Sequence, residues 1–507
     1  MTWNDCLAVL RAHDLLSYRG TDSARAGECG QATVTGIACD SRRVTAGNVF
    51  VALLGQHDDG VRYATEAVAR GAVAVVAAQP APGTIDVAWL VVSDARRALA
   101  LLAAEHAGHP SRAMRVVGIT GTNGKTTTAY LTASMFDAAG IPCGLVGTVG
   151  YRIGQKMREA THTTPEATEV QSLFREMVDA GCGACAMEVS SHALSLHRVD
   201  GVRFAAGVFT NLTRDHLDFH ADMEAYFQAK RRLFDMLPDD APSVINLDDP
   251  RGATLADVAK QPVTYAISRP ADVTPGPLSF SLRGLSFDVR TPRGTLQIQS
   301  SLVGRPNVYN ILASVATASS LGLPLPAIEQ GVATLDGVPG RFQVVSSERD
   351  DVTVVVDYAH TDDALRNLLE TARPLAQGRL LTVFGCGGDR DRTKRPLMGA
   401  VAGRLSDVII ITSDNPRSED PARIIEEVQR GITPDTRRDS AQRILAIVDR
   451  REAIDKAIAL ARAGDLVLIA GKGHEKNQVI GREVFPFDDA AVAHEALDRK
   501  RSNSGVS

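Results

Sequence analysis

The sequence has 507 residues, too many for a single hydrophobic core, and at roughly 150 residues per domain it predicts about three domains. Hydrophobic residues make up 44% of the chain and charged residues 23%, values that exclude wholesale disorder. No apolar run approaches the roughly 20 residues that cross a bilayer, and the first residues lack the basic flank and apolar stretch of a secretory signal. We therefore expect a protein that is not inserted in a membrane.

The formal net charge of -5 excludes a broad basic face, so we expect no nucleic-acid partner. The seven cysteines show neither disulfide-framework nor metal-ligand spacing: Cys6, Cys29, Cys39, Cys143, Cys182, Cys185 and Cys386. Reduced thiols are typical of the cytoplasm, so we expect a cytoplasmic protein. We also expect a monomer.

Two breaker-rich stretches, residues 108–111 and 337–340, divide the chain into three blocks. The predicted domains are residues 1–111, 112–338 and 339–507. The first block carries four apolar runs and then a helical pattern, at residues 34–38, 49–54, 72–77, 88–92 and 94–107. This alternation predicts an α/β domain.

The second and third blocks repeat the alternation of strand and helix. In the second, a buried-strand pattern at residues 114–119 runs into a glycine-rich turn and a helical pattern over 126–139. In the third, strand-like runs alternate with helical patterns, at residues 352–356, 364–376, 380–384, 408–412, 454–463 and 466–470. This rhythm predicts right-handed βαβ units around a mostly parallel sheet, so the whole fold is predicted to be α/β.

The turn after the first central strand reads Gly121-Thr-Asn-Gly-Lys-Thr-Thr127, the pattern of a phosphate-binding P-loop. Backbone N–H groups would surround phosphate oxygens, Lys125 would pair with the outer phosphates, and the Thr126 hydroxyl would reach Mg²⁺. The common pattern has a glycine where this chain has Ile119, which disfavours GTPase switches and motors. An ordinary glycine-rich turn is the alternative interpretation.

This turn and six other motifs carry a resemblance to a known family. The others are Met187-Glu-Val-Ser-Ser-His192, Thr210-Asn-Leu-Thr-Arg-Asp-His216, Asp357-Tyr-Ala-His-Thr361, Gly385-Cys-Gly-Gly-Asp-Arg390, Asp414-Asn-Pro-Arg417 and Gly471-Lys-Gly-His-Glu475. With them the chain resembles the Mur ligase family, the ATP-dependent amide-bond-forming enzymes of peptidoglycan precursor synthesis. The resemblance implies an N-terminal α/β UDP-binding domain, a central P-loop ATPase-like parallel-sheet domain and a C-terminal Rossmann-like domain that binds an amino acid.

The motifs of the last block narrow the resemblance to members that add meso-2,6-diaminopimelate to UDP-MurNAc-L-Ala-D-Glu. Such enzymes phosphorylate the D-Glu carboxylate with ATP, and the amine then attacks the acyl phosphate. One alternative is the relative that adds L-lysine. Others are a folylpolyglutamate or cyanophycin synthetase of the same superfamily, and a P-loop switch or scaffold that performs no acyl transfer.

The resemblance implies an ATP and magnesium site in the central block. Asn307 and Asn310 lie three residues apart, on one helix face where they would bracket adenine, although helix capping by Asn307 is an alternative. The implied ATP contacts are Gly121, Thr122, Asn123, Gly124, Lys125, Thr126, Thr127, Asn307, Asn310, Arg341 and Asp357. Catalysis is implied for Lys125, Glu188, His216 and Lys230, and two Mg²⁺ sites for Thr126, Glu188, His216 and Lys230.

Lys230 opens a run of three basic residues, Lys230-Arg-Arg232, on a predicted helix. Such a run usually forms a solvated face or a phosphate patch. By resemblance, Lys230 matches the lysine that these ligases carbamylate with CO₂, which turns a cation into an anion that ligates the second Mg²⁺.

The resemblance also implies contacts with UDP-MurNAc-L-Ala-D-Glu, whose diphosphate and carboxylates require hydroxyl groups and arginines. The implied contacts are Cys39, Ser41, Gln56, His57, Asp58, His162, Thr163, Thr164, Ser190, Leu196 and Arg198. Leu196 stands where some relatives carry a polar residue. For the residues of the first block, polar loops after strands are the alternative interpretation.

Four motifs of the last block each follow a strand-like run, and ligands of doubly wound sheets collect beyond the carboxyl ends of the strands. Diaminopimelate differs from lysine by a distal carboxylate, which a guanidinium group binds well, while an acid binds the amine. The predicted contacts are Arg390, Asp414, Asn415, Pro416, Arg417, Gly471 and Glu475. For residues 414–417, a turn and helix N-cap before Pro421 is the alternative interpretation.

Overall fold

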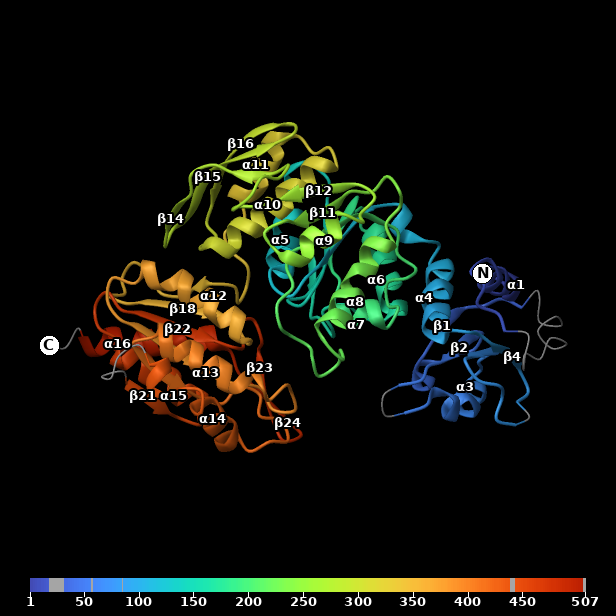
Figure 1. Ribbon diagram of the computed structural model, residues 1–507. Helices are drawn as coiled ribbons and strands as arrows, with labels where there is room; N and C mark the ends of the chain where they lie inside the picture. Colours follow the sequence, from blue (N-terminus) through green and yellow to red (C-terminus); the bar gives the residue numbers. More distant parts are fainter. Residues whose placement is uncertain (18–31, 56–57, 84, 438–442, 505–507) are drawn as a thin grey trace.

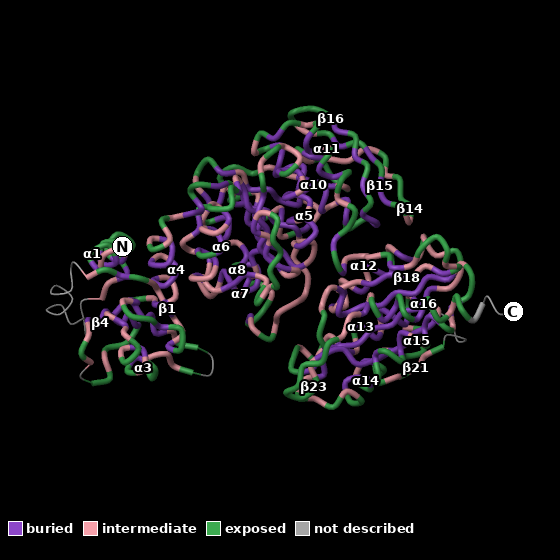
Figure 2. The backbone as a smooth tube through the Cα atoms, turned by 180° about the vertical axis from the view of Figure 1, so that it is seen from behind, coloured by how far each residue is buried: buried purple, intermediate pink, exposed green. Residues whose placement is uncertain are grey.

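The computed structural model describes residues 1–17, 32–55, 58–83, 85–437 and 443–504. The chain forms three lobes in sequence order, with the central lobe between the other two (Figure 1). Seen from behind, the buried segments run through the interior of each lobe (Figure 2). Each lobe contains a sheet with parallel strands and helices packed on it, which confirms the predicted α/β class. The exact boundaries at residues 111 and 338 stay predictions.

The N-terminal lobe is built on a parallel sheet ordered β1-β2-β3-β4. Its strands are β1 (Gly36–Ala38), β2 (Asn48–Ala52), β3 (Ala74–Ala77) and β4 (Ala88–Val91). The helices α1 (Trp3–Ala12) and α4 (Ala95–His106) pack on one face and α3 (Ala64–Ala69) on the other. Short 3₁₀ helices, η1 (Ser41–Arg43) and η2 (Gly60–Tyr63), lie in the connections after β1 and β2.

The central lobe contains a larger sheet ordered β12-β11-β10-β5-β9-β6-β7-β8, in which only β7 and β8 are antiparallel to their neighbours. Its strands are β5 (Arg115–Thr120), β6 (Cys143–Val146), β7 (Tyr151–Ile153), β8 (Lys156–Arg158), β9 (Ala184–Glu188), β10 (Phe204–Phe209), β11 (Ser243–Asn246) and β12 (Pro262–Tyr265). One face is covered by α5 (Lys125–Ala138), α10 (Arg305–Ser320) and α11 (Leu325–Ala333). The other face is covered by α6 (Ala167–Asp179), α7 (Ser191–Ser195), α8 (Met223–Asp235) and α9 (Pro250–Ala256). The 3₁₀ helix η3 (Pro110–Arg112) leads into this lobe.

A small antiparallel sheet extends the central lobe, and the sequence patterns did not predict it. It contains β13 (Thr274–Pro275), β14 (Ser279–Ser281), β15 (Gly284–Thr291) and β16 (Gly294–Ser300). Along β15, buried Leu285, Phe287 and Val289 alternate with exposed or half-buried positions, so only one face of the sheet joins the core. Alternation of this kind is typical of antiparallel sheets with one solvated face.

The C-terminal lobe has a sheet ordered β17-β18-β22-β19-β20-β21, parallel except for β17. Its strands are β17 (Gln343–Val344), β18 (Thr353–Asp357), β19 (Leu380–Phe384), β20 (Val408–Ile411), β21 (Arg443–Ala446) and β22 (Leu466–Ala470). The helices are α12 (Asp362–Ala372), α13 (Lys394–Leu405) and α14 (Pro421–Gln429) on one face, and α15 (Arg450–Leu460) and α16 (Asp489–Ser504) on the other. The 3₁₀ helices η4 (Arg373–Leu375) and η5 (Pro434–Thr436) and the hairpin β23 (Asn477–Ile480) to β24 (Glu483–Pro486) complete it.

A buried arginine fixes the carboxyl ends of two central strands of this sheet. Arg450 donates to the carbonyl oxygens of Ser413, after β20, at 3.3 Å and of Ala470, at the end of β22, at 3.1 Å. Its guanidinium also donates twice to Asp489 at the start of α16, at 2.8 and 2.7 Å. Both side chains of the ion pair are fully buried, so each buried charge is offset by the charge of its partner.

A second buried arginine, Arg395, holds the loop after β19. It donates to the carbonyl oxygen of Gly387 at 3.2 Å and to the carboxylates of Glu419 and Glu427 at 2.8 to 2.9 Å. Glu419 in turn accepts the backbone N–H of Asp389 at 2.7 Å. The loops at the carboxyl end of this sheet are therefore fixed from behind by buried charge.

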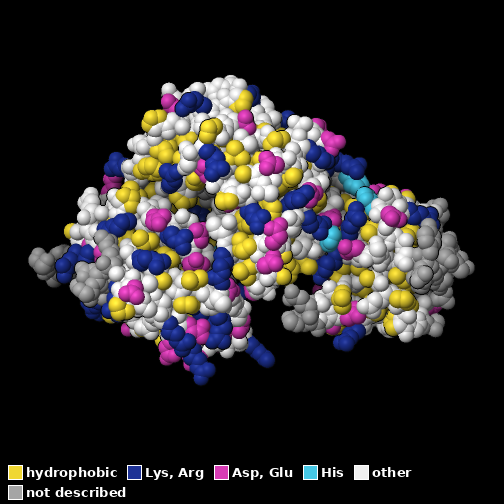
Figure 3. All heavy atoms as spheres, in the orientation of Figure 1, with side chains coloured by type: hydrophobic (Ala, Val, Ile, Leu, Met, Phe, Trp, Pro, Cys, Tyr) yellow, Lys and Arg dark blue, Asp and Glu magenta, His cyan; other side chains and the backbone are white. Residues whose placement is uncertain are grey.

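The surface carries charges of both signs. On the face shown in Figure 3, Lys and Arg side chains are interspersed with Asp and Glu side chains. Within the described ranges, each helix is too short or too polar to cross a bilayer. The cysteines of those ranges are free thiols.

The hydrogen bonds from Arg395 lower the pKa of Glu419 from its ordinary 4.5 to about 2. Because the folded-state pKa is the lower one, the ionised pair stabilises the fold above about pH 4.5 and loses this effect as the pH falls towards 2. We expect Glu419→Gln to lower the Tm at neutral pH, with a difference from the wild type that shrinks below about pH 4.5. Calorimetry across this range checks it, with exposed Glu426→Gln on the nearby helix α14 as the control. A Tm difference independent of pH would contradict it.

Candidate functional site

A cavity of about 1430 Å³ opens between the central and C-terminal lobes. Its walls include the loops that follow β5, β9 and β10 in one lobe and β18, β19, β20 and β22 in the other. The carboxyl ends of two parallel sheets thus face a common space, the place where such sheets bind ligands.

The turn between β5 and α5 has the backbone conformation of an anion-binding loop. Gly121 and Gly124 have φ of +145° and +88°. A Cβ at these positions would lie 1.9 Å from Thr210 Oγ1 and 2.3 Å from Asn310 Oδ1, so both positions require glycine. Gly124 is the N-cap residue of α5 and makes no side-chain cap, which leaves the N–H groups of the first helical turn for a ligand.

Two lysine side chains converge on the carbonyl oxygen of Gly121. Lys125 Nζ donates to it at 2.9 Å and to the Thr122 carbonyl at 2.8 Å, and Lys230 Nζ donates to it at 2.8 Å. Lys230 extends from α8, is 1% exposed and lies 4.4 Å from the centre of the Tyr226 ring. Burial lowers the pKa of both lysines, and Lys125 lowers the pKa of Lys230 further. Burial of this kind favours either the neutral form of the amine or the binding of an anion beside it.

Glu188 ends β9 and is 1% exposed. Its carboxylate accepts the backbone N–H of Thr148 at 2.8 Å and the Thr148 hydroxyl at 3.1 Å. The Thr148 hydroxyl lies 3.0 Å from that of Thr163, while the Thr164 hydroxyl donates to the Glu188 carbonyl at 2.8 Å and accepts the Ser190 N–H at 3.0 Å. Thr148 therefore links the carboxylate to the segment 162–164.

His216 lies on the same side of the cavity, in a left-handed conformation with φ of +55°. Its ring packs edge-on against that of His192 with centroids 4.8 Å apart, and Nε2 lies 3.4 Å from the Asp215 carboxylate. Burial, together with the charges of Lys125 and Lys230, lowers the pKa of His216 to about 3. The imidazole is therefore neutral at physiological pH and has a lone pair to offer.

Arg341, from the C-terminal lobe, reaches the P-loop. Its guanidinium donates to the Thr126 hydroxyl at 3.0 Å and lies 4.8 Å from the centre of the Tyr358 ring. Asp357, at the end of β18, accepts the backbone N–H of Phe342 at 2.7 Å. Burial raises the pKa of Asp357, and Arg341 opposes this effect.

Two further contacts join the lobes around the cavity. Asn123 Nδ2 donates to Asp363 at 3.1 Å, and Arg214 donates to Asp391 at 3.1 Å. The P-loop and the loop before His216 are thus both tied to the C-terminal lobe, so the structure shows the two lobes in contact.

Asn307 and Asn310 both border the cavity from the first turns of α10. Asn310 Nδ2 donates to Asn307 Oδ1 at 2.9 Å, and Asn307 Nδ2 donates to the Val303 carbonyl at 2.8 Å. The helix N-cap is Gly304, so the alternative that Asn307 caps the helix is wrong.

Six of the seven predicted amino-acid contacts border the C-terminal side of the cavity: Arg390, Asp414, Asn415, Arg417, Gly471 and Glu475. Pro416 is buried beside them and does not line it. Arg417, with φ of +51°, donates to the Gly388 carbonyl at 2.7 Å, while Arg390 is exposed. Asp420 caps α14, so the alternative that residues 414–417 form the helix cap is wrong.

The central-lobe candidates also come together in this cavity, apart from Gly121, which lies behind the loop surface. His162, Thr163, Thr164, Ser190, Leu196 and Arg198 line it. Arg198 donates to the Thr164 carbonyl at 2.9 Å, and the Ser190 hydroxyl caps α7.

The N-terminal candidates do not line the cavity. Cys39, Ser41 and Asp58 lie in the connections after β1 and β2, and the Ser41 hydroxyl donates to Glu66 at 2.9 Å. Gln56 and His57 lie outside the described residues. The polar-loop interpretation therefore stays open for this group.

Sequence reasoning missed several residues that line or support the site. Thr148 follows a short strand without a recognisable motif, and Asp363 and Arg214 act through partners distant in sequence. Lys472 lies within the Gly471–Glu475 motif, where a buried lysine next to an acid would have been a usable signal.

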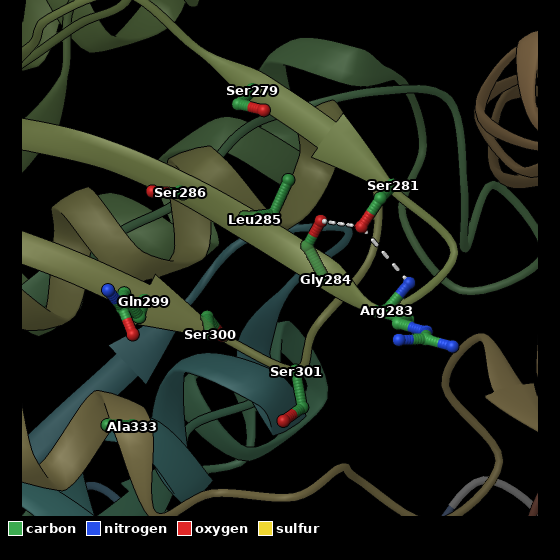
Figure 4. A pocket seen from close by; sticks show the side chains of 10 residues that line it. All are labelled: Ser279, Ser281, Arg283, Gly284, Leu285, Ser286, Gln299, Ser300, Ser301 and Ala333. Carbon is green, nitrogen blue, oxygen red and sulfur yellow. Dashed lines mark hydrogen bonds between the residues drawn. The ribbon is translucent and has the colours of Figure 1, made fainter.

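A second, smaller hollow of about 400 Å³ lies beside β14, β15 and β16. Figure 4 shows Ser281 at the edge of this hollow, where its hydroxyl donates to the Gly284 carbonyl and accepts the backbone N–H of Arg283. None of the predicted site residues lines it.

Three family models match the chain. They are the Mur ligase family catalytic domain over residues 33–107, the Mur ligase middle domain over 119–318 and the Mur ligase glutamate ligase domain over 340–473.

Named relatives extend the match over nearly the whole chain. A protein of Geobacter sulfurreducens named UDP-N-acetylmuramoyl-L-alanyl-D-glutamate--2,6-diaminopimelate ligase is 49% identical over 93% of this chain and 96% of its own length. A Geobacillus thermodenitrificans protein of the same name is 44% identical over 93% and 96%.

Solved structures agree with this match. A structure titled as the same ligase is 35% identical, with a TM-score of 0.66 over 93% of this chain and 96% of that one. MurF ligase from Thermotoga maritima in complex with ADP, at 17% identity and a TM-score of 0.62 over 92% and 99%, shares the fold. This chain belongs to the Mur ligase family.

Proposed function

We propose that this protein is an ATP-dependent ligase that joins meso-2,6-diaminopimelate to the D-Glu carboxylate of UDP-MurNAc-L-Ala-D-Glu. The products would be the UDP-MurNAc-tripeptide, ADP and phosphate. The names of relatives between 43 and 49% identical support this proposal. The observation that carries it is that one cavity holds both a P-loop and a pocket with two arginines and an acid.

The proposed chemistry explains the distribution of charge in the cavity. A carboxylate oxygen attacks the terminal phosphorus of ATP, and ADP leaves. The amine then attacks the carbonyl carbon of the acyl phosphate, loses a proton and expels phosphate. Both steps concentrate negative charge, which Lys125, the N–H groups at the start of α5 and Arg341 offset.

The same pocket favours diaminopimelate over the L-lysine alternative. Arg390 and Arg417 offer guanidinium groups to the distal carboxylate, which lysine lacks. Asp414, Asn415 and Glu475 offer oxygens to the distal ammonium, while Gly471 and Pro416 shape the loops.

The residues present fit magnesium as a partner of ATP. Within the described residues, no three His, Cys, Asp or Glu side chains cluster closely enough to hold a metal by themselves. The Thr126 hydroxyl, the Glu188 carboxylate and the neutral His216 ring border the cavity and would complete a coordination shell together with phosphate oxygens. When bound, Mg²⁺ would neutralise phosphate charge.

Lys230 fits carbamylation by CO₂. The buried amine contacts the carbonyl oxygen of Gly121 and the ring of Tyr226, and its lowered pKa increases the neutral fraction that reacts with CO₂. A carbamate there would place a negative charge beside Lys125 and would serve as a ligand of the second Mg²⁺.

The N-terminal lobe would bind the UDP part of UDP-MurNAc-L-Ala-D-Glu. We assign the UDP contacts to Cys39, Ser41, Gln56, His57 and Asp58, and the muramoyl-peptide contacts to the central-lobe residues that line the cavity. The domains would be residues 1–111, 112–338 and 339–507, in a monomer that works in the cytoplasm without a nucleic-acid partner.

A substrate panel tests the proposed function. We expect phosphate release from ATP only when UDP-MurNAc-L-Ala-D-Glu and meso-diaminopimelate are both present, because phosphate leaves only in the second step, when the amine attacks the acyl phosphate. Phosphate release and tripeptide are measured together. Release without an amino acid would indicate a nucleotide switch, and preference for L-lysine would indicate the other relative.

Lys230→Ala should lower kcat by roughly 100-fold, because the variant has no amine to carbamylate. Mass spectrometry of the native wild type should find the added CO₂, and bicarbonate depletion should slow the wild type alone. Arg231→Ala, the next residue on α8, is the control. An unmodified Lys230 together with unimpaired Lys230→Ala activity would disprove the assignment.

Arg417→Ala should lower kcat/KM for diaminopimelate by orders of magnitude, because the distal carboxylate loses its guanidinium partner. The exposed Arg423→Ala on α14 is the matched control. A loss smaller than about tenfold, or about 1.4 kcal/mol, would remove Arg417 as the selecting residue.

A further inference from the structure

The amino-acid pocket contains a buried lysine that the proposed mechanism does not use. Lys472 is fully buried, and its Nζ lies 3.1 Å from Asn415 Oδ1, 3.1 Å from Glu475 Oε2 and 3.6 Å from Asp414 Oδ1. The partners come from the loops after β20 and β22. One ammonium therefore joins the two loops that carry most of the predicted contacts.

The surroundings hold this ammonium in a fixed place. Asn415 Oδ1 also accepts the Val479 N–H at 3.0 Å, and Asn415 Nδ2 donates to Glu475 Oε2 at 2.9 Å. Asp414 is 6% exposed and borders the cavity, and its Oδ1 has no hydrogen-bond partner within the described residues. The pocket thus has a carboxylate oxygen without a hydrogen-bond partner 3.6 Å from the Lys472 ammonium.

The charges of the pocket are consequently unequal. Asp414 and Glu475 contribute two carboxylates, whereas Lys472, Arg390 and Arg417 contribute three cationic groups. Because Lys472 is buried, its field reaches the cavity with little screening by salt or water. A ligand that brings one positive and one negative group fits this balance better than one that brings a positive group alone.

We propose that Lys472 is a specificity-determining residue, which disfavours an amino acid whose side chain ends in an ammonium alone. This inference rests on the proposed function. The two candidate substrates both bring a distal ammonium, which Lys472 repels similarly. Diaminopimelate alone brings a distal carboxylate, which Lys472 attracts. Without Lys472, Asp414 and Glu475 would bind a cationic side chain more readily.

A competition experiment tests the role of Lys472. Full-length wild type, Lys472→Met and Lys472→Gln are each given UDP-MurNAc-L-Ala-D-Glu, ATP and a mixture of meso-diaminopimelate with excess L-lysine. Mass spectrometry counts the two products. We expect the share of lysine product to rise at least about tenfold in both variants, while KM for ATP stays within about twofold.

Lys476→Met is the matched control, because Lys476 is in the same segment, is 64% exposed and pairs with Asp488 at the surface. Its product ratio should equal that of the wild type. The Gln variant keeps a polar group in the buried position, so it serves if Lys472→Met does not fold.

Two failures can be told apart. A wild type that makes no product with diaminopimelate would refute the proposed function itself. A wild type that uses diaminopimelate, with no rise in lysine product in a folded Lys472 variant, would overturn only the role of Lys472.

Discussion

Two ammonium groups that share one carbonyl oxygen, half-buried Lys125 and buried Lys230, set the conditions for the rest of the site. Lys125 and Lys230 approach Gly121 from different helices, and within the described residues neither forms an ion pair with an acid. Buried cations without a carboxylate in contact are costly unless an anion arrives or the amine becomes neutral. A phosphorylated ligand would bring the negative charge that these two lysines lack, and the helices α5 and α8 hold both lysines beside the phosphate loop.

The net charge of -5 and this cationic site are compatible because the cations are contributed by separate lobes. Lys125 and Arg198 come from the central lobe, while Arg341, Arg390 and Arg417 come from the C-terminal lobe, and all five border one cavity. Arg341 contacts Thr126 across the boundary between the lobes. These five cations are thus brought together where the lobes meet, while the face shown in Figure 3 carries charges of both signs.

Local patterns were sufficient for the buried parallel strands and for the P-loop. The runs 380–384 and 466–470 coincide with β19 and β22, because central parallel strands are apolar along their whole length. The sheet β13 to β16 was not predicted, because buried apolar and exposed polar residues alternate along its half-exposed strands. The contact of Lys472 with Asn415 was not predicted either, since the two residues are 57 positions apart in sequence. The first-block candidates came from resemblance alone, and those that the structure describes, Cys39, Ser41 and Asp58, do not line the cavity.

The ion pair between Arg450 and Asp489 has a consequence for the order in which the protein can be completed. Asp489 begins the last helix, yet through Arg450 it fixes the carbonyl groups after β20 and β22, beside the amino-acid pocket. A nascent chain still lacking its final residues can already form the nucleotide loop, but it holds Arg450 as a buried charge without its partner. During synthesis this buried support of the amino-acid pocket can therefore form only after residue 489 is made, and a chain cut before that residue would lack it.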